Sequence, residues 1–425
     1  MKNLLSYLLT GFVAMSFFAC QKSSDLVSST NTPPPAGSYI KSAHLKGTLK
    51  GSLKQDSTYY LDGDMIVNPK DSFGVSPGVK ILATGNYRIE MAGTLICNGT
   101  EAKPITISVK DPSTAYANLG DKGYWGGILV DSTAKYVSIK FTHINYTGGP
   151  DATGSAQASF DVEGSQSYDA GAKIIFEDNW MFGGIDDGVH LAGNITCSVK
   201  RNVMQRLGGP DGDLFNIKAG AHGDIAYNYI WSSSNSGIKL GTGKKVLTPQ
   251  TKWNIYNNTF VNGNWRKVGE LSSAILIDQF AAATVYNNVI VGCRNGINIS
   301  TKADVNNCKY SNNLLYMYDA KVDTFTNMPY VIGSAGTQQP TDKIAAGLTP
   351  CGTVFTNWDK DVTVCLVDNT IPSLKTGSPA IGTGTTSASV PFYSVGSAMP
   401  LNRDMGAYPT DGTGNKHLPT TKPVQ

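Results

Sequence analysis

The sequence of 425 residues has little charge and few of the residues that mark helical or metal-binding proteins. Only 16% of its residues are charged and its net charge is +3, so it lacks the basic surface by which proteins bind nucleic acids. It has no long amphipathic pattern of helical period, which argues against a helical bundle. Its seven cysteines and five histidines form no Cys-x-x-Cys pair or other zinc-site spacing.

The first residues are typical of a targeting segment. Lys2 precedes an apolar run from Leu4 to Phe18, which is too short to span a membrane comfortably. A basic start, a short apolar run and then a small residue predict a signal peptide over residues 1–19. Cys20 follows Ala19, and the alternatives are a lipidated cysteine or an incidental one after an ordinary secretory signal.

The residues around Cys20 resemble the lipobox and the short polar export tag of bacterial surface lipoproteins. This resemblance implies that Cys20 is the lipidated first residue of the mature chain, and that the protein is an outer-membrane lipoprotein exposed on the cell surface. Residues 20–38 include Pro33-Pro34-Pro35 and predict a flexible to semi-extended tether between the lipid and the folded body.

The remaining cysteines belong to an exported chain, in which disulfides can form. Cys351 and Cys365 flank a short polar stretch, so we predict a disulfide between them. Cys197, Cys293 and Cys308 are expected to be small buried hydrophobic residues.

Short strands recur between residues 128 and 300, each with two large apolar residues at positions i and i+2. Such alternation predicts a half-buried strand, and its recurrence every 22 to 37 residues predicts coils stacked into a solenoid. The apolar pairs are Ile128 and Val130, Phe160 and Val162, Val189 and Leu191, Phe215 and Ile217, Ile238 and Leu240, Ile275 and Ile277, and Ile297 and Ile299.

An asparagine follows a second set of short strands, once in each repeat. Asparagine tolerates left-handed backbone and bonds locally, so it suits a tight corner. Stacked corners would bring these side chains together as a hydrogen-bonded ladder. The asparagines are Asn179, Asn202, Asn228, Asn258, Asn288 and Asn313.

Two stretches carry a resemblance at the level of fold. The sequence GVKILATGNYRIEMAGTLICNGTEAKPITIS and the following YWGGILVDST resemble the opening coils of secreted bacterial right-handed parallel β-helix proteins, the pectate-lyase-like fold. This implies an all-β, right-handed parallel β-helix over residues 39–326. The fold hosts lyases, hydrolases, adhesins and structural proteins, so it does not by itself give the function.

The last hundred residues resemble a different part of such proteins. Residues 377–382 (GSPAIG) and 402–408 (NRDMGAY) are similar to the paired "SPAIDxG … DIGAYE" motif that closes many secreted β-helices. The resemblance implies that residues 327–425 form a capping region and tail, and we expect this cap to cover the open edge of the last coil.

The outward positions of the repeated strands are the candidate site, since neighbouring coils stack about 4.8 Å apart. The candidate catalytic residues are Asp187, His190, Asp213, Lys218 and Lys239.

Two reactions fit these residues. In β-elimination on a uronate glycan, the resemblance to β-helix alginate and chondroitin lyases implies Lys218 as the base, with Lys239 as the neighbouring cation. In glycoside hydrolysis, Asp187 and Asp213 would form the pair of carboxylates.

Two further groups complete the candidate site. Asp131, Asp161 and Glu163 are expected to cluster on the first two of these coils, where three carboxylates could hold Ca²⁺. Asn216 and Asp278 on the outward face, with Trp253 and Trp265 in a long insert, are candidates for binding substrate. The sequence therefore predicts a monomeric, surface-anchored protein that engages polysaccharide as a binding module or as an enzyme. The alternative is an adhesive or structural surface protein.

Overall fold

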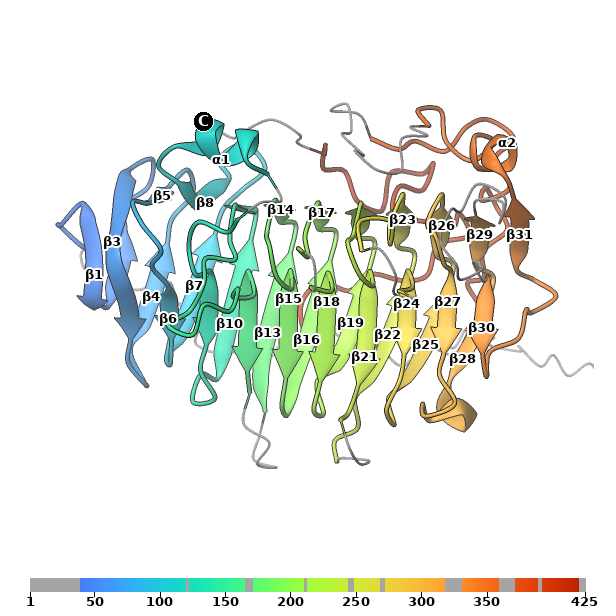
Figure 1. Cartoon of the computed structure of the whole chain (residues 1–425), viewed down its shortest axis with the longest axis horizontal. Helices are drawn as coiled ribbons and strands as arrows, with labels where there is room; N and C mark the ends of the chain where they lie inside the picture. The colour runs from blue at the N-terminus through green and yellow to red at the C-terminus, as the bar shows by residue number, and fades with distance from the viewer. Residues whose placement is uncertain are drawn as a thin grey trace, which may run out of the picture.

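The computed structural model describes residues 39–119, 122–164, 171–209, 212–243, 248–267, 272–317, 331–358, 371–388 and 392–419. The predicted signal peptide, Cys20 and the tether lie outside these residues. The described part is an all-β solenoid of parallel strands stacked along one axis (Figure 1). The prediction of a right-handed parallel β-helix is confirmed.

The strands stand in three columns, and a coil from the middle of the stack contributes one strand to each. The first column contains β1 (His44–Thr48), the first part of β3 (Thr58–Val67), β5 (Lys80–Ala83), β8 (Ile105–Val109), β11 (Thr142–Asn145), β14 (Trp180–Phe182), β17 (Val203–Gln205), β20 (Tyr229–Trp231), β23 (Thr259–Val261), β26 (Val289–Val291), β29 (Leu314–Met317) and β31 (Lys343–Ala346). The second contains the end of β3, then β6 (Ile89–Met91), β9 (Ile128–Val130), β12 (Phe160–Glu163), β15 (Val189–Ala192), β18 (Phe215–Lys218), β21 (Ile238–Gly241), β24 (Ile275–Ile277), β27 (Ile297–Ile299) and β30 (Ile332–Ser334). The long strand β3 joins these two columns into one 21-stranded sheet.

The third column is a separate 10-stranded sheet. It contains β2 (Gly51–Leu53), β4 (Ser72–Val75), β7 (Thr94–Asn98), β10 (Tyr136–Lys140), β13 (Ala172–Glu177), β16 (Ile195–Lys200), β19 (His222–Ala226), β22 (Lys252–Tyr256), β25 (Ala282–Tyr286) and β28 (Lys309–Ser311). The chain passes from the first column to the second, then to the third, and back to the first in the next coil.

Helical structure is scarce in the described part. It consists of α1 (Pro112–Ala117), α2 (Leu348–Cys351) and the 3₁₀ turn η1 (Val305–Asn307). None of the helices among the described residues has the length and apolar character needed to cross a membrane.

The strand register predicted from the apolar pairs is confirmed in the second column. Val189 pairs with Phe215, Phe215 with Ile238, and Ile238 with Ile275. These side chains point inward and are fully buried, and they form the core that fills the coils. The outward residues between them are therefore also in register.

The predicted asparagine ladder is confirmed at the corner between the third and first columns. The side-chain amide of Asn228 donates to Oδ1 of Asn258 at 3.0 Å, and the main-chain N–H of Asn228 donates to the same oxygen. The pattern repeats from Asn179 to Asn313. The ladder satisfies buried main-chain groups at a corner where the strands themselves cannot.

The cysteines are partly as expected. Cys197 and Cys293 are buried, whereas Cys308 is half-buried. Cys351 is buried, with its Sγ 2.9 Å from the carbonyl oxygen of Tyr316. Its expected partner, Cys365, lies outside the described residues.

The C-terminal region follows a path that the sequence did not indicate. Strands β30 and β31 continue the stack beyond the expected boundary at residue 326. The later described segments, red in Figure 1, lie along the side of the stack at the asparagine-ladder corner. The chain runs back along the coils, since Thr383 contacts Asn312 while Asn415 contacts Asn202.

The two C-terminal motifs bind each other in this tail. Oδ1 of Asp404 accepts a hydrogen bond from the main-chain N–H of Gly382 at 2.8 Å. The N–H of Met405 donates to the carbonyl of Ala380, and the N–H of Gly384 donates to the carbonyl of Arg403. The motifs therefore fold into one unit that fixes the tail against the coils.

Candidate functional site

The outward face of the second column brings several of the candidate residues into one row. Asp161 pairs in register with His190, His190 with Asn216, and Asn216 with Lys239. Each residue stands on the neighbouring coil, so the row crosses β12, β15, β18 and β21. The sequence-based alignment of this row is confirmed.

Asp187 and Asp213 lie at one edge of the row, where the chain turns from the first column into the second. Oδ1 of Asp187 accepts the main-chain N–H of Asp213 at 2.7 Å, and Oδ1 of Asp213 accepts the N–H of Ser236 at 2.9 Å. Each carboxylate thus accepts a main-chain hydrogen bond from the next coil with one oxygen. The second oxygen of each contacts a residue of the row: Asp187 Oδ2 accepts from the amide of Asn216 at 2.8 Å, and Asp213 Oδ2 lies 3.1 Å from Nζ of Lys239.

Burial gives the Asp187 carboxyl an unusual affinity for its proton. Its side chain is largely withdrawn from water, and the residue is only 9% exposed. Burial is the main cause that raises the pKa of Asp187 to about 6, and the negative charges of Asp186 and Asp213 add to it. Near neutral pH this carboxyl therefore exchanges a proton readily, which is the property required of a general acid or base.

His190 and Asp161 form a second acid–base pair beside Asp187. Nδ1 of His190 lies 2.7 Å from Oδ1 of Asp161. Burial alone would lower the pKa of His190, but the hydrogen bond and charge of Asp161 more than offset it, so the pKa is raised. Arg88 approaches the other oxygen of Asp161 at 3.9 Å. Sequence reasoning missed Arg88 because it lies at a corner of an earlier coil, outside the aligned strands.

The remaining polar candidates on this face differ in their surroundings. Asn216 is buried, and its Oδ1 accepts no hydrogen bond from the described residues. Lys218 is exposed and lies opposite Gly241, so the neighbouring coil places no cation beside it at this register. Asp278 is half-buried, two coils away from Lys218, at the end of β24.

The tryptophan assignments are corrected. Trp253 is 0% exposed in the core, and its Nε1 donates to the carbonyl of Ala221 at 2.8 Å. Trp265 is also buried, and its Nε1 donates to the carbonyl of Gly292 at 2.9 Å. Because protein covers both faces of these rings, neither ring is free to stack on a sugar.

The proposed calcium cluster is also corrected. Among the described residues, no three His, Cys, Asp or Glu side chains lie close enough together to hold a metal ion. Asp131 turns back to the N–H of Thr133 at 2.8 Å, Asp161 is engaged by His190, and Glu163 is exposed. Asp131 and Asp161 therefore bind different partners and do not converge with Glu163.

Comparison of the chain with protein-family models, with curated proteins and with solved structures finds no match.

Proposed function

We propose that this protein binds polysaccharide on the outward face of the second column and hydrolyses its glycosidic bonds there. The observation that carries this proposal is the pair of carboxylates on adjacent coils. The Asp187 carboxyl, whose pKa is raised to about 6, would donate a proton to the leaving oxygen. Asp213, paired with Lys239, would act as the second carboxylate.

The neighbouring coils support a chemical role for these two aspartates. The equivalent corner positions in the following coils carry Ser236 and Ser273, as the main-chain bonds between corners show. A corner of this kind therefore forms without a carboxylate. Burying two carboxylates together costs free energy, which indicates a purpose other than holding the corner.

The rest of the row supplies groups suited to a sugar. The side-chain amide of Asn216 donates to Oδ2 of Asp187 and holds that carboxylate against the row. His190 and the half-exposed ammonium of Lys239 lie beside Asn216 in register. The lyase alternative is less well supported because Lys218 faces Gly241 on the next coil.

The position of the protein in the cell is part of the same proposal. A lipid on Cys20 and a tether over residues 20–38 would hold the monomeric β-helix at the outer-membrane surface, where extracellular polysaccharide is accessible. Mass spectrometry of the membrane fraction tests this, since a diacylglyceryl group on Cys20 must be found.

The activity is tested by incubating the purified protein with a panel of neutral and acidic polysaccharides. New reducing ends without unsaturated sugars indicate hydrolysis, and we expect Asp187→Asn to reduce their rate by about 100-fold or more. Glu90→Gln, on the same face two coils before Asp161, is the matched control. Unsaturated uronate products would show that the protein acts by β-elimination and would contradict hydrolysis. Binding without any product would show that the protein is a binding module and not an enzyme.

A further inference from the structure

A second polar site lies at the asparagine-ladder corner, on a different edge of the solenoid. The residue before each ladder asparagine has a left-handed backbone, and so has Phe141, which precedes Thr142 at the same corner of the preceding coil; φ lies between 48° and 60°. In the later coils this residue is Asn257, Asn287 or Asn312, which tolerate that conformation. In the earlier coils the corner residue is Phe141, Asp178, Arg201 or Tyr227, so bulky or charged side chains replace the residue that fits best.

Three of these four exceptions line one pocket of about 690 Å³. Phe141, Asp178 and Arg201 come from successive coils, and Lys416 and His417 of the tail close the opposite side. Strained backbone that coincides with a cavity points to a use for the side chains that it holds.

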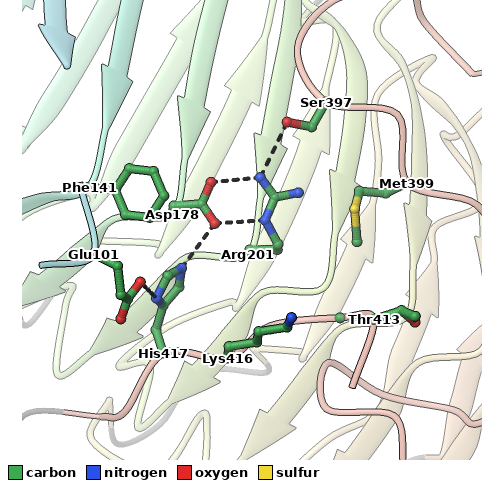
Figure 2. A pocket seen from close by; sticks show the side chains of 10 residues that line it. Glu101, Phe141, Asp178, Arg201, Ser397, Met399, Thr413, Lys416 and His417 are labelled. Carbon is green, nitrogen blue, oxygen red and sulfur yellow. Dashed lines mark hydrogen bonds and ion pairs between the residues drawn. The ribbon is translucent and has the colours of Figure 1, made fainter. Parts of the chain in front are cut away.

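The two carboxylates that line this pocket have polar partners. Arg201 donates two hydrogen bonds to Asp178, from Nε to Oδ1 at 2.7 Å and from Nη2 to Oδ2 at 2.6 Å, as Figure 2 shows. The ring of His417 is only 3% exposed and lies between two acids, with Nε2 2.9 Å from Asp178 and Nδ1 2.8 Å from Glu101. The Arg201 guanidinium therefore offsets the negative charge that Asp178 would present to an anionic ligand.

Two donors on basic side chains still face the pocket, although the charge of Arg201 is shared with Asp178 and Glu177. In Figure 2 the Nη1 amino group of Arg201 is turned away from Asp178, and no hydrogen bond from it to the described residues is formed. Lys416 is exposed and forms no ion pair within the described part of the chain. A planar guanidinium edge and an ammonium together match a carboxylate.

We propose that this pocket binds the carboxylate of an acidic sugar, a uronate, with Arg201 and Lys416 as its cationic contacts. Phe141 and Met399 would supply the apolar surface for the C–H face of the ring. The choice of a glycan as the source of the carboxylate rests on the proposed function. The pocket lies at another corner from Asp187, so it would act as a separate subsite that retains an acidic polysaccharide.

Calorimetric titration of the full protein with a uronate trisaccharide tests this inference, with the neutral trisaccharide and acetate as the comparison ligands. We expect the uronate to bind more tightly than both. Lys416→Met should weaken that binding about threefold to fivefold, and Lys416→Glu should weaken it further. Because Lys416 is exposed, both variants should fold, and Lys375→Met, an exposed tail lysine, is the matched control.

The possible outcomes separate this inference from the proposed function. Equal binding of neutral and acidic sugars, or equal affinity of Lys416→Met and Lys375→Met, overturns the subsite. Acetate binding as tightly as the uronate would identify a site for small carboxylates and overturn the assignment to a sugar. If Lys239→Met weakens uronate binding and Lys416→Met does not, the ligand lies on the outward face, and only the proposed function survives.

Discussion

Replacing Asp187 with asparagine should make the protein more stable at neutral pH while removing its activity. The substitution keeps the oxygen that accepts the N–H of Asp213. The new amide then faces the amide of Asn216, which at present donates to Asp187. Asn216 can rotate its side-chain amide, because its Oδ1 has no donor among the described residues and can accept from the new group.

The magnitude follows from the pKa of the Asp187 carboxyl. Folding raises this pKa from 3.8 to about 6, which makes the ionised form about 3 kcal/mol less favourable in the folded protein, at about 1.4 kcal/mol per pKa unit. The carboxyl therefore contributes stability fully below about pH 3.8, and that contribution is lost as the pH rises through about 6. Roughly 2 kcal/mol of the change falls between pH 4 and pH 6.5.

Urea denaturation of both proteins at steps from pH 4 to pH 6.5 measures this effect. We expect the free energy of unfolding of Asp187→Asn, relative to the original protein, to rise by about 2 kcal/mol across this range. A change in packing would shift the difference in free energy of unfolding by the same amount at every pH, so the dependence of that difference on pH would remain. A difference that is independent of pH would refute the assignment of a raised pKa to Asp187, and with it the proton donor.

Two other substitutions test how the coils are held. Asn258→Ala should lower the free energy of unfolding by about 3–6 kcal/mol, because it leaves the main-chain and side-chain N–H groups of one ladder neighbour and one buried carbonyl unpaired. The exposed Asn307→Ala should change stability by less than about 0.5 kcal/mol, and similar values for the two would contradict a stabilising ladder. Lys200→Met should cost about 3–5 kcal/mol by leaving the buried Asp224 without its cation, whereas Lys200→Met with Asp224→Asn should recover most of it. Failure of the double variant to recover stability would show that the packing of Lys200, and not its charge, matters.

The fold could be predicted because two simple periods recur in the sequence. Alternation in pairs such as Val189 and Leu191 fixed which face of each strand is inward, and a shift of one residue would have exposed all of these side chains. The same parity identifies the error at Trp253. It lies two residues before Ile255 on β22, so both point inward, and the prediction that Trp253 lies in an insert overlooks this alternation.

The path of the tail could not be predicted in the same way. The two C-terminal motifs predict that they pair with each other, and the hydrogen bond from Gly382 to Asp404 agrees with this. They do not predict which side of the stack the pair covers. That choice depends on side chains such as Asn257 and Asn287, whose amides bind tail carbonyls. Contacts between residues more than 100 positions apart leave no periodic trace in the sequence.

The position of Asp187 and Asp213 limits how any test of activity can be read. Each aspartate uses one oxygen to hold the next coil and the other to face the row of candidate residues. Removing the whole side chain would therefore disturb the corner and the chemistry together, and a loss of activity would be ambiguous. Asparagine retains the structural oxygen, removes the proton exchange and requires only that the Asn216 amide rotate. An Asp187→Asn protein that is folded, more stable above pH 6 and inactive would separate the two roles, whereas an inactive Asp187→Ala protein would not.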